Sequence, residues 1–109
     1  NNELLTFDAL FIASGMTPRF TPEVSKYDNV FTLRTIDDAH KIHQSLSSDC
    51  HLVVVGSSFI GMELAAATFS KVKSVHVIGR SDVPFKESLG KEIGERVQEL
   101  FESKGVVFH

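Results

Sequence analysis

The apolar residues of this chain fall into short blocks, some strand-like and some spaced as in a helix. The most informative block is residues 52–55, Leu-Val-Val-Val, an unbroken aliphatic run typical of a parallel strand buried on both faces. It stops at Gly56, and apolar residues then recur at helical spacing from Phe59 to Phe69. The pattern predicts a buried strand, a tight glycine turn and a helix.

The alternation of strand and helix continues to the end of the chain. Residues 74–78 predict a second strand, and residues 91–104 an amphipathic helix. Gly105 suits the C′ position of that helix, and residues 106–108 begin a third strand. The order β-α-β-α-β predicts an α/β fold: a Rossmann-like parallel half-sheet with strand order 3-2-1, flanked by helices. A complete doubly wound domain has more strands, so we expect a truncated one.

The first part of the chain has a different pattern. Residues 6–13 form another strand-like run, which ends at Ser14-Gly15. Thr17-Pro18 and Thr21-Pro22 then mark a connector, because proline fixes φ and lacks an N–H donor. Residues 1–28 are therefore interpreted as a strand and a connector that precede the Rossmann-like unit.

A short strand and a helix are expected before the glycine turn. Residues 29–33 predict an edge strand. Thr35 is an N-cap candidate, with Asp37 and Asp38 placed where negative charge favours the helix dipole. Helical spacing of apolar residues then continues to about residue 48.

Composition narrows the class of protein. The 109 residues are 42% hydrophobic and 23% charged, with a net charge of −3, which argues against nucleic acid or an anionic membrane as the main partner. No apolar run approaches the ~18 residues of a spanning helix, and no targeting segment is visible. A single cysteine, Cys50, excludes an internal disulfide and suits a reducing compartment. We expect an intracellular protein, cytoplasmic or mitochondrial.

The glycine turn carries the main candidate site. Its sequence, Gly-Ser-Ser-Phe-Ile-Gly over residues 56–61, differs by one residue from the G-x-G-x-x-G fingerprint of dinucleotide sites. Gly56 lets the chain leave the strand sharply, and Gly61 lets the helix pack tightly on the sheet. The pyrophosphate then faces free N–H groups at the positive helix N-terminus. Ser58 replaces the middle glycine: its Cβ takes space there, although its hydroxyl could donate to a phosphate. The alternative is a turn that only packs.

The end of the second strand bears on the choice of cofactor. Gly79 lies about 20 residues after the turn, where an NAD-specific site has an acid for the ribose hydroxyls, and glycine cannot serve. Arg80 follows, and its planar fork suits a 2′-phosphate, with Lys86 a possible second charge. The sequence therefore predicts NADPH, or both cofactors, rather than NADH alone. The alternative is that Arg80 is a solvated loop residue.

Other chemistry finds little support. His40 and His43 could reach one metal from a helix, but no further ligand has a supporting spacing, so no metal site is predicted. His51, His76 and His109 are interpreted as packing residues at strand edges. No G-x-x-x-x-G-K-[ST] motif is present, which excludes a P-loop nucleotide hydrolase at the motif level. No general base or nucleophile can be named.

Two motifs in tandem carry a family resemblance. They are Thr-Phe-Asp-Ala-Leu-Phe-Ile-Ala-Ser-Gly-Met-Thr-Pro, residues 6–18, and Val-Val-Val-Gly-x-x-x-Ile-Gly-x-Glu-x-Ala, which begins at Val53. Together they resemble the FAD-dependent pyridine nucleotide-disulfide oxidoreductases. Residues 59–63 and 83–90 are most similar to the branch of apoptosis-inducing-factor-like and ferredoxin-reductase-type proteins.

The resemblance implies roles for particular residues. Residues 1–28 correspond to the tail of an FAD-domain segment and a connector, with Ser14 and Gly15 approaching the flavin. Residues 29–109 correspond to an NAD(P)-binding domain, incomplete at its C-terminus. Glu63 would lie near the nicotinamide and flavin; the alternative is a first-turn glutamate that stabilises the helix dipole. The residues implied to contact the dinucleotide around the turn are Gly56, Ser57, Ser58, Phe59, Ile60 and Gly61.

The favoured function is therefore the NAD(P)H-binding portion of an FAD-dependent oxidoreductase in which hydride passes from NAD(P)H to flavin. The chain alone is expected to be inactive and to hold no FAD. Expected partners are the dinucleotide, an electron-acceptor protein and a second copy paired through the open sheet edge. One alternative is a non-catalytic Rossmann module in apoptotic signalling. Another is a different Rossmann enzyme, such as a methyltransferase, against which Gly79 counts.

Overall fold

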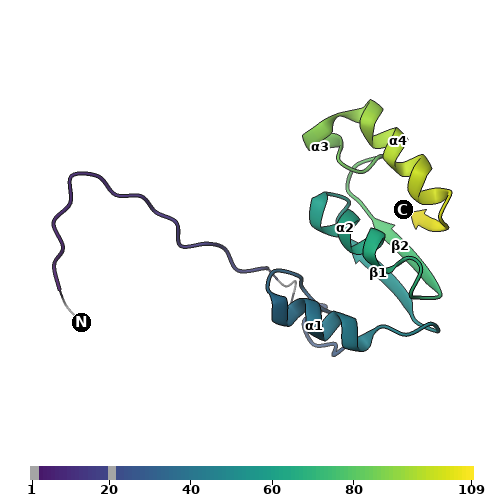
Figure 1. Ribbon diagram of the computed structural model, residues 1–109, viewed down its shortest axis with the longest axis horizontal. Coiled ribbons are helices and arrows are strands. Elements are labelled where there is room, and N and C mark those ends of the chain that lie inside the picture. The colour runs from purple at the N-terminus through teal and green to yellow at the C-terminus, as the bar shows by residue number, and fades with distance from the viewer. Residues whose placement is uncertain (1–2, 20–21) are drawn as a thin grey trace.

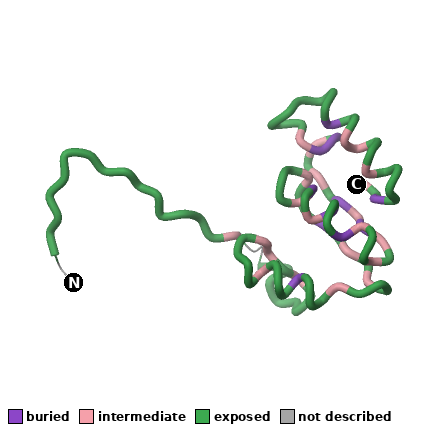
Figure 2. Tube along the Cα trace, in the orientation of Figure 1, coloured by how far each residue is buried: buried purple, intermediate pink, exposed green. Residues whose placement is uncertain are grey.

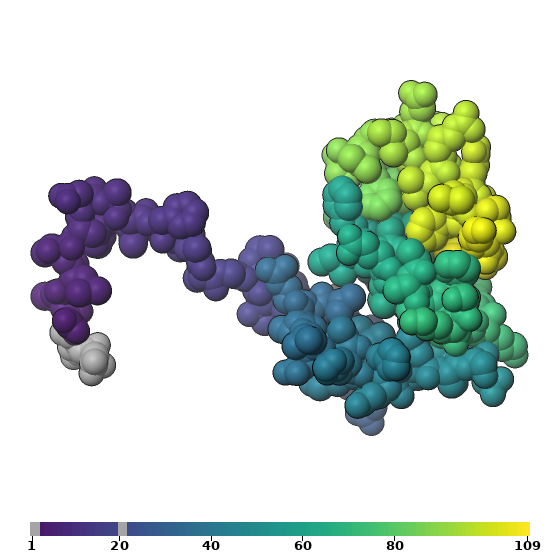
Figure 3. Space-filling model, viewed as in Figure 1, coloured from purple at the N-terminus to yellow at the C-terminus, as the bar shows by residue number. Residues whose placement is uncertain are grey.

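The chain divides into an extended segment and a small α/β unit (Figure 1). The computed structural model describes residues 3–19 and 22–109. Its radius of gyration is 17.9 Å, whereas a compact domain of this length has about 13 Å. The difference arises because the first residues lead away from the sheet, and Figure 3 shows them as a thin arm beside the body.

The α/β unit contains three parallel strands. In chain order the elements are α1 (Ile36–Ser45), β1 (His51–Val55), α2 (Phe59–Thr68), β2 (Ser74–Ile78), α3 (Lys86–Leu89), α4 (Lys91–Glu102) and β3 (Val106–Phe108). β2 lies in the middle and pairs in parallel with β1 on one side and β3 on the other. This is the predicted order 3-2-1, so the Rossmann-like parallel half-sheet is confirmed.

The core lies between the sheet and α2, with α4 beside it. Val54, Val75 and Val77 point to one face of the sheet and are at most 4% exposed. Met62 and Ala65 of α2 pack on them as part of the same buried cluster, and Phe101 of α4 meets Phe108 of β3 edge to face, with ring centroids 6.5 Å apart. Figure 2 shows the buried residues gathered along this layer.

The opposite face of the sheet corrects one expectation. Val53 and Val55 of β1 are 53% and 82% exposed, so the prediction of a strand buried on both faces is wrong. The reason is the position of the helices: α2 and α4 both cover the face that carries Val54, and no other helix of the described residues covers Val53 and Val55. The aliphatic run therefore identified the strand but not its surroundings.

The two strands expected before the turn are absent from the described residues. Residues 6–13 are extended without strand pairing, and Phe11 among them is 91% exposed. Residues 29–33 likewise form no strand. A strand requires a neighbouring backbone to accept and donate its hydrogen bonds, and none lies beside these segments. The expected connector includes Thr21, which lies outside the described residues.

The helix before the turn begins where the sequence predicts. Thr35 caps α1 with a capping box: the Asp38 N–H donates to Thr35 Oγ1 at 3.2 Å, and the Thr35 N–H donates to Asp38 Oδ2 at 2.9 Å. The backbone and hydroxyl of Thr35, and the Arg34 N–H, lower the pKa of the Asp38 carboxyl. The helix ends at Ser45, a few residues earlier than expected.

The loop after β2 contains a short helix that the sequence did not predict, α3. It follows Phe85, which has a left-handed backbone conformation with φ 59°. α4 starts at the predicted Lys91 and ends at Glu102, with Ser103 as its C-cap. The C′ position therefore falls on Lys104, and Gly105, expected there, lies one residue beyond it. None of the helices among residues 3–19 and 22–109 is long and apolar enough to cross a bilayer.

Candidate dinucleotide-binding site

The glycine turn joins β1 to α2 and is bonded to the end of the neighbouring strand. The Gly56 N–H donates to the Ile78 carbonyl oxygen at 2.8 Å, so the turn continues the β1–β2 pairing by one residue. Gly56 has φ 115°, a conformation that side chains rarely adopt. The chain can therefore leave the strand at this point only with glycine or with strain.

Gly61 is needed for a different reason, close packing. A Cβ at this position would collide with the Gly56 carbonyl oxygen, and would lie 3.0 Å from the Gly56 carbonyl carbon and 3.2 Å from Val54 Cγ1. The first turn of α2 therefore rests directly on the glycine turn. These two glycines lie where the fingerprint requires them, and for the two physical reasons expected.

The N-terminus of α2 is open to a ligand. Ser58 is the N-cap, with an extended backbone, and its carbonyl accepts the Met62 N–H at 3.0 Å. The Ser58 side chain makes no capping hydrogen bond, so the N–H groups of the first turn are available to an anion. The first turn also holds no acidic residue. Glu63 is the fifth residue of α2, and its interpretation as a first-turn glutamate is wrong.

A cavity of about 290 Å³ lies at the carboxyl ends of β2 and β3, next to the turn. In open α/β sheets, ligands bind at this edge. The cavity brings together three of the residues singled out from the sequence, Ser57, Gly79 and Arg80. It is also lined by Ser81, Asp82, Val83, Pro84, Gln98, Phe108 and His109.

Gly79 and Ser57 lie too close together for a larger residue at position 79. A Cβ there would lie 2.5 Å from Ser57 Oγ and 3.1 Å from Ser57 Cβ. An acid at position 79 would therefore require Ser57 to move. The backbone of Ser57 is held in place, because its carbonyl oxygen accepts the Phe85 N–H at 3.0 Å. The packing around Gly79 therefore disfavours the acid that an NAD-specific site has at this position.

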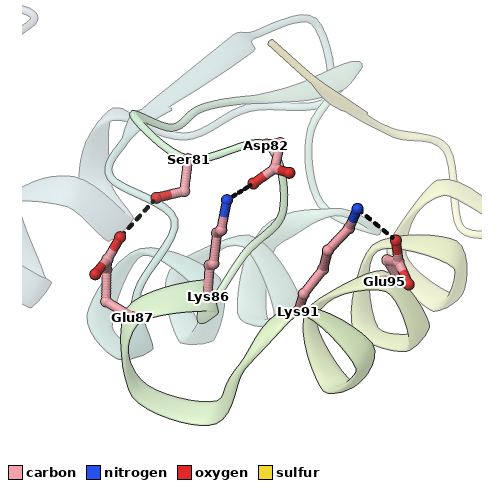
Figure 4. Close-up of polar contacts among 6 residues, drawn as sticks. All are labelled: Ser81, Asp82, Lys86, Glu87, Lys91 and Glu95. Carbon is pink, nitrogen blue, oxygen red and sulfur yellow. Dashed lines mark hydrogen bonds and ion pairs between the residues drawn. The ribbon is translucent and has the colours of Figure 1, made fainter.

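The sequence suggested Lys86 as a second positive charge beside Arg80. In the structure Lys86 instead forms an ion pair with an acid of the loop after β2. Figure 4 shows Lys86 paired with Asp82, Nζ to Oδ1 at 2.7 Å, and Ser81 bonded to Glu87 at 3.4 Å. The hydrogen bond from Lys86 lowers the pKa of Asp82, and the same bond raises the pKa of Lys86. Asp82 lines the cavity and was missed from the sequence; Lys86 does not line it.

Several predicted residues lie away from this cavity. Ser14 and Gly15 belong to residues 3–19, which form the extended arm that leads away from the sheet in Figure 1. Ile60 and Glu63 line a separate hollow of about 280 Å³ between α1 and α2. Phe59 is 48% exposed, and its ring packs on Phe85, with centroids 4.9 Å apart. The structure therefore brings the turn and the end of β2 together at one cavity, whereas the residues expected near the flavin lie elsewhere.

The histidines on the open face of the sheet bond across neighbouring strands. His76 Nδ1 and His109 Nε2 lie 3.0 Å apart, and His51 Nδ1 lies 2.7 Å from Ser74 Oγ.

Within residues 3–19 and 22–109, no three potential ligands lie close enough together to hold a metal ion.

The remaining lining residues, from Val83 onward, were missed as site residues because they come from the loop after β2, from α4 and from the end of β3. One sequence signal could have indicated them: Gly94, a glycine inside a helix, which marks a close backbone approach. A Cβ at Gly94 would lie 2.5 Å from the Pro84 carbonyl oxygen and 2.6 Å from Val83 Cγ2. This contact places α4 against the cavity.

The fold and site together define a class. A parallel strand that passes through a glycine turn into a helix, beside a cavity at the carboxyl edge of the sheet, is the arrangement of Rossmann-type dinucleotide-binding domains. Comparison with known proteins gives the family. A family model described as pyridine nucleotide-disulphide oxidoreductase matches residues 1–109, and the chain belongs to that family.

Relatives and solved structures agree with this assignment. The chain is 36% identical over 106 residues to apoptosis-inducing factor 3 of Mus musculus. The matched region covers 96% of this chain and 17% of that protein. It resembles the ferredoxin reductase for the CYP199A2 system of Rhodopseudomonas palustris, with a TM-score of 0.72, 26% identity, and coverage of 77% of this chain and 21% of that one. It also resembles putidaredoxin reductase in its covalent complex with putidaredoxin, with a TM-score of 0.67, 27% identity, and coverage of 71% and 18%.

The chain thus spans about a fifth of the length of the proteins it matches. The resemblance drawn from the two sequence motifs is confirmed at the level of the family.

Proposed function

We propose that this chain is the NAD(P)H-binding portion of an FAD-dependent oxidoreductase. The observation that carries the proposal is the contact between Gly61 and the Gly56 carbonyl, which brings the open N-terminus of α2 against the glycine turn. Binding a pyrophosphate is the best-attested reason for a helix to start so close to the end of a strand. Membership of the family supports the same assignment.

The residues present fit a dinucleotide. The free N–H groups of the first turn of α2 would donate to the pyrophosphate, and the Ser58 hydroxyl, which makes no capping bond, is available to donate as well. The cavity beside Gly79 would take the adenosine half. When bound, NAD(P)H supplies a hydride and the flavin of the intact protein accepts it. The chain's own residues bind and orient the cofactor; no proton transfer is assigned to them.

Arg80 is proposed to set the preference between cofactors. Arg80 lines the cavity, and its side chain is exposed. Asp82, an acid that lines the same cavity, is already paired with Lys86. A 2′-phosphate would therefore meet an arginine fork and a neutralised carboxylate. We infer that NADPH binds at least as well as NADH.

One relative supports a proposal about the partner of the intact protein. The putidaredoxin reductase structure is a covalent complex of that reductase with putidaredoxin. We infer that the intact form of this protein also passes electrons to a small acceptor protein. The exposed apolar arm, with Phe11 at 91% exposed, suits packing on a flavin domain. Pairing of two copies through the open sheet edge stays a prediction.

Replacing Gly56 with valine tests the proposal. A β-branched residue is strained at φ 115°, so the turn should change its path while the core cluster around Val54 and Met62 remains. In the full-length protein, calorimetric titration should find NAD(P)H binding abolished with the circular dichroism spectrum largely kept. Unchanged affinity in this variant would mean that the turn is not the cofactor site.

A further inference from the structure

The hydroxyl group of Ser57 takes the place of the acid that position 79 lacks. A Cβ at position 79 would lie 2.5 Å from Ser57 Oγ. This is close to the distance between the Cβ of an aspartate and its own carboxylate oxygens. The Ser57 oxygen therefore lies about as far from that Cβ as the oxygen of an acid at position 79 would.

The backbones on both sides of this contact are fixed by hydrogen bonds. On the turn, the Ser57 carbonyl oxygen accepts the Phe85 N–H at 3.0 Å. On the strand, the Gly79 N–H donates to the His109 carbonyl oxygen at 3.1 Å, which extends the pairing of β2 with β3 by one residue. The close approach of Ser57 to Gly79 is therefore part of the folded framework of the site.

The contact lies at the cavity and is accessible from it. Ser57 and Gly79 both line the cavity of about 290 Å³, and both are half-buried rather than sealed from solvent. Arg80, which is exposed, lines the same cavity. A hydroxyl group and a guanidinium group thus meet at the end of β2, where Rossmann sites hold the adenosine ribose of a dinucleotide.

A hydroxyl group differs from a carboxylate in what it can bind at this place. An ionised carboxylate only accepts hydrogen bonds, so it suits the 2′-hydroxyl group of NADH and repels the 2′-phosphate of NADPH. A serine hydroxyl both donates and accepts. It can accept a hydrogen bond from the 2′-hydroxyl group of NADH, and it can donate one to the 2′-phosphate of NADPH.

We propose that Ser57 Oγ forms a hydrogen bond with the 2′ substituent of the adenosine ribose, which makes Ser57 a specificity-determining residue that admits both cofactors. This inference rests on the proposed function. It goes beyond it by naming the side chain that contacts the 2′ position. It also explains the glycine at position 79, because an acid there and the Ser57 hydroxyl group would occupy the same place.

The test measures the Kd of three ligands for the full-length protein: NADH, NADPH and the analogue of NADH that lacks the 2′-hydroxyl group of the adenosine ribose. The native protein should bind this 2′-deoxy analogue about fivefold more weakly than NADH. Ser57→Ala should bind NADH about fivefold and NADPH about tenfold more weakly, and the analogue with native affinity. Ser70→Ala, which changes an exposed serine just beyond α2, should alter none of the three values.

A second variant exchanges the two groups. Ser57→Gly combined with Gly79→Asp removes the hydroxyl group and supplies a carboxylate in its place. This variant should bind NADPH at least tenfold more weakly than NADH, because the carboxylate then faces the 2′-phosphate. A double variant that binds NADPH as tightly as NADH would contradict the inference.

The failures of the first test can be told apart. Equal binding of NADH and its 2′-deoxy analogue by the native protein overturns the inference, and this result requires no variant. Unchanged affinities in Ser57→Ala overturn it as well. So does an equal loss for all three ligands, which would indicate a disturbed turn rather than a lost contact with the 2′ position. Absence of any dinucleotide binding by the native protein overturns the proposed function and this inference together.

Discussion

The substitution Gly61→Ala probes the contact on which the proposed site depends. The added methyl group would meet the Gly56 carbonyl oxygen and lie 3.2 Å from Val54 Cγ1, in a place with no free space. Overpacking of this kind costs typically about 1–3 kcal/mol. Replacing a helical glycine with alanine returns about 0.8–1.0 kcal/mol through helix propensity. Because the clash is with backbone atoms, the cost lies at the upper end of the overpacking range, and the net loss of stability is about 2 kcal/mol. The circular dichroism spectrum checks that the variant stays folded.

The substitution should weaken binding as well as stability. To accept the methyl group, α2 must move away from the glycine turn, and the N–H groups of its first turn move with it. Loss of one hydrogen bond to a charged phosphate costs about 1.5–3 kcal/mol, which corresponds to a Kd raised about ten- to a hundredfold. Calorimetric titration of the full-length protein with NADPH measures this change directly.

A matched control separates packing at the site from helix stability. Ala66→Gly lies on an exposed position of α2 and should cost about 0.8–1.0 kcal/mol through propensity alone, with an unchanged Kd. The reasoning is refuted if Gly61→Ala binds NADPH as tightly as the native protein, or if Ala66→Gly weakens binding to the same extent.

The remaining predictions concern the cation of the cavity, the cap of α1 and the flavin. Arg80→Ala should weaken NADPH binding about tenfold and NADH binding little, whereas Lys91→Ala, whose lysine pairs with Glu95 outside the cavity, should change neither; a native preference of tenfold or more for NADH would contradict this. Thr35→Ala should lower stability by about 1 kcal/mol, seen as faster hydrogen exchange in α1. The lowered pKa of Asp38 means that its stabilising effect is complete above its unfolded-state pKa and is lost as the pH falls below about 4, so acid titration should weaken α1, and Asp38→Asn should remove that dependence. The chain of residues 1–109 alone should be colourless after dialysis; a preparation that stays yellow would contradict the absence of FAD.

The elements of the α/β unit were predictable because each has a strong local signal. The aliphatic run at Leu52–Val55, the helical spacing after Phe59 and the capping box at Thr35 all depend on residues close in sequence. The order of the strands followed from the alternation of strand and helix. The turn could be recognised for a similar reason, since Gly56 and Gly61 are required by backbone geometry at that point of the chain.

The errors have a common physical origin, which is dependence on distant neighbours. Residues 6–13 have the composition of a strand but no adjacent backbone to pair with, and Val55 has the composition of a core residue but no helix over it. The position of Lys86 depended on Asp82, an acid four residues earlier in an irregular loop. Gln98 could not be selected from its spacing, because it lines a cavity that only the folded arrangement of α4 and the loop after β2 creates.

Flavin absorbance in the full-length protein, followed without oxygen as NADPH is added, tests the central claim most directly. The account predicts that the native protein is yellow, that NADPH bleaches the flavin band, and that Gly56→Val keeps the flavin but is not bleached at the same cofactor concentration. A native protein whose flavin is unaffected by both NADPH and NADH, or a Gly56→Val variant bleached at the native rate, would contradict it.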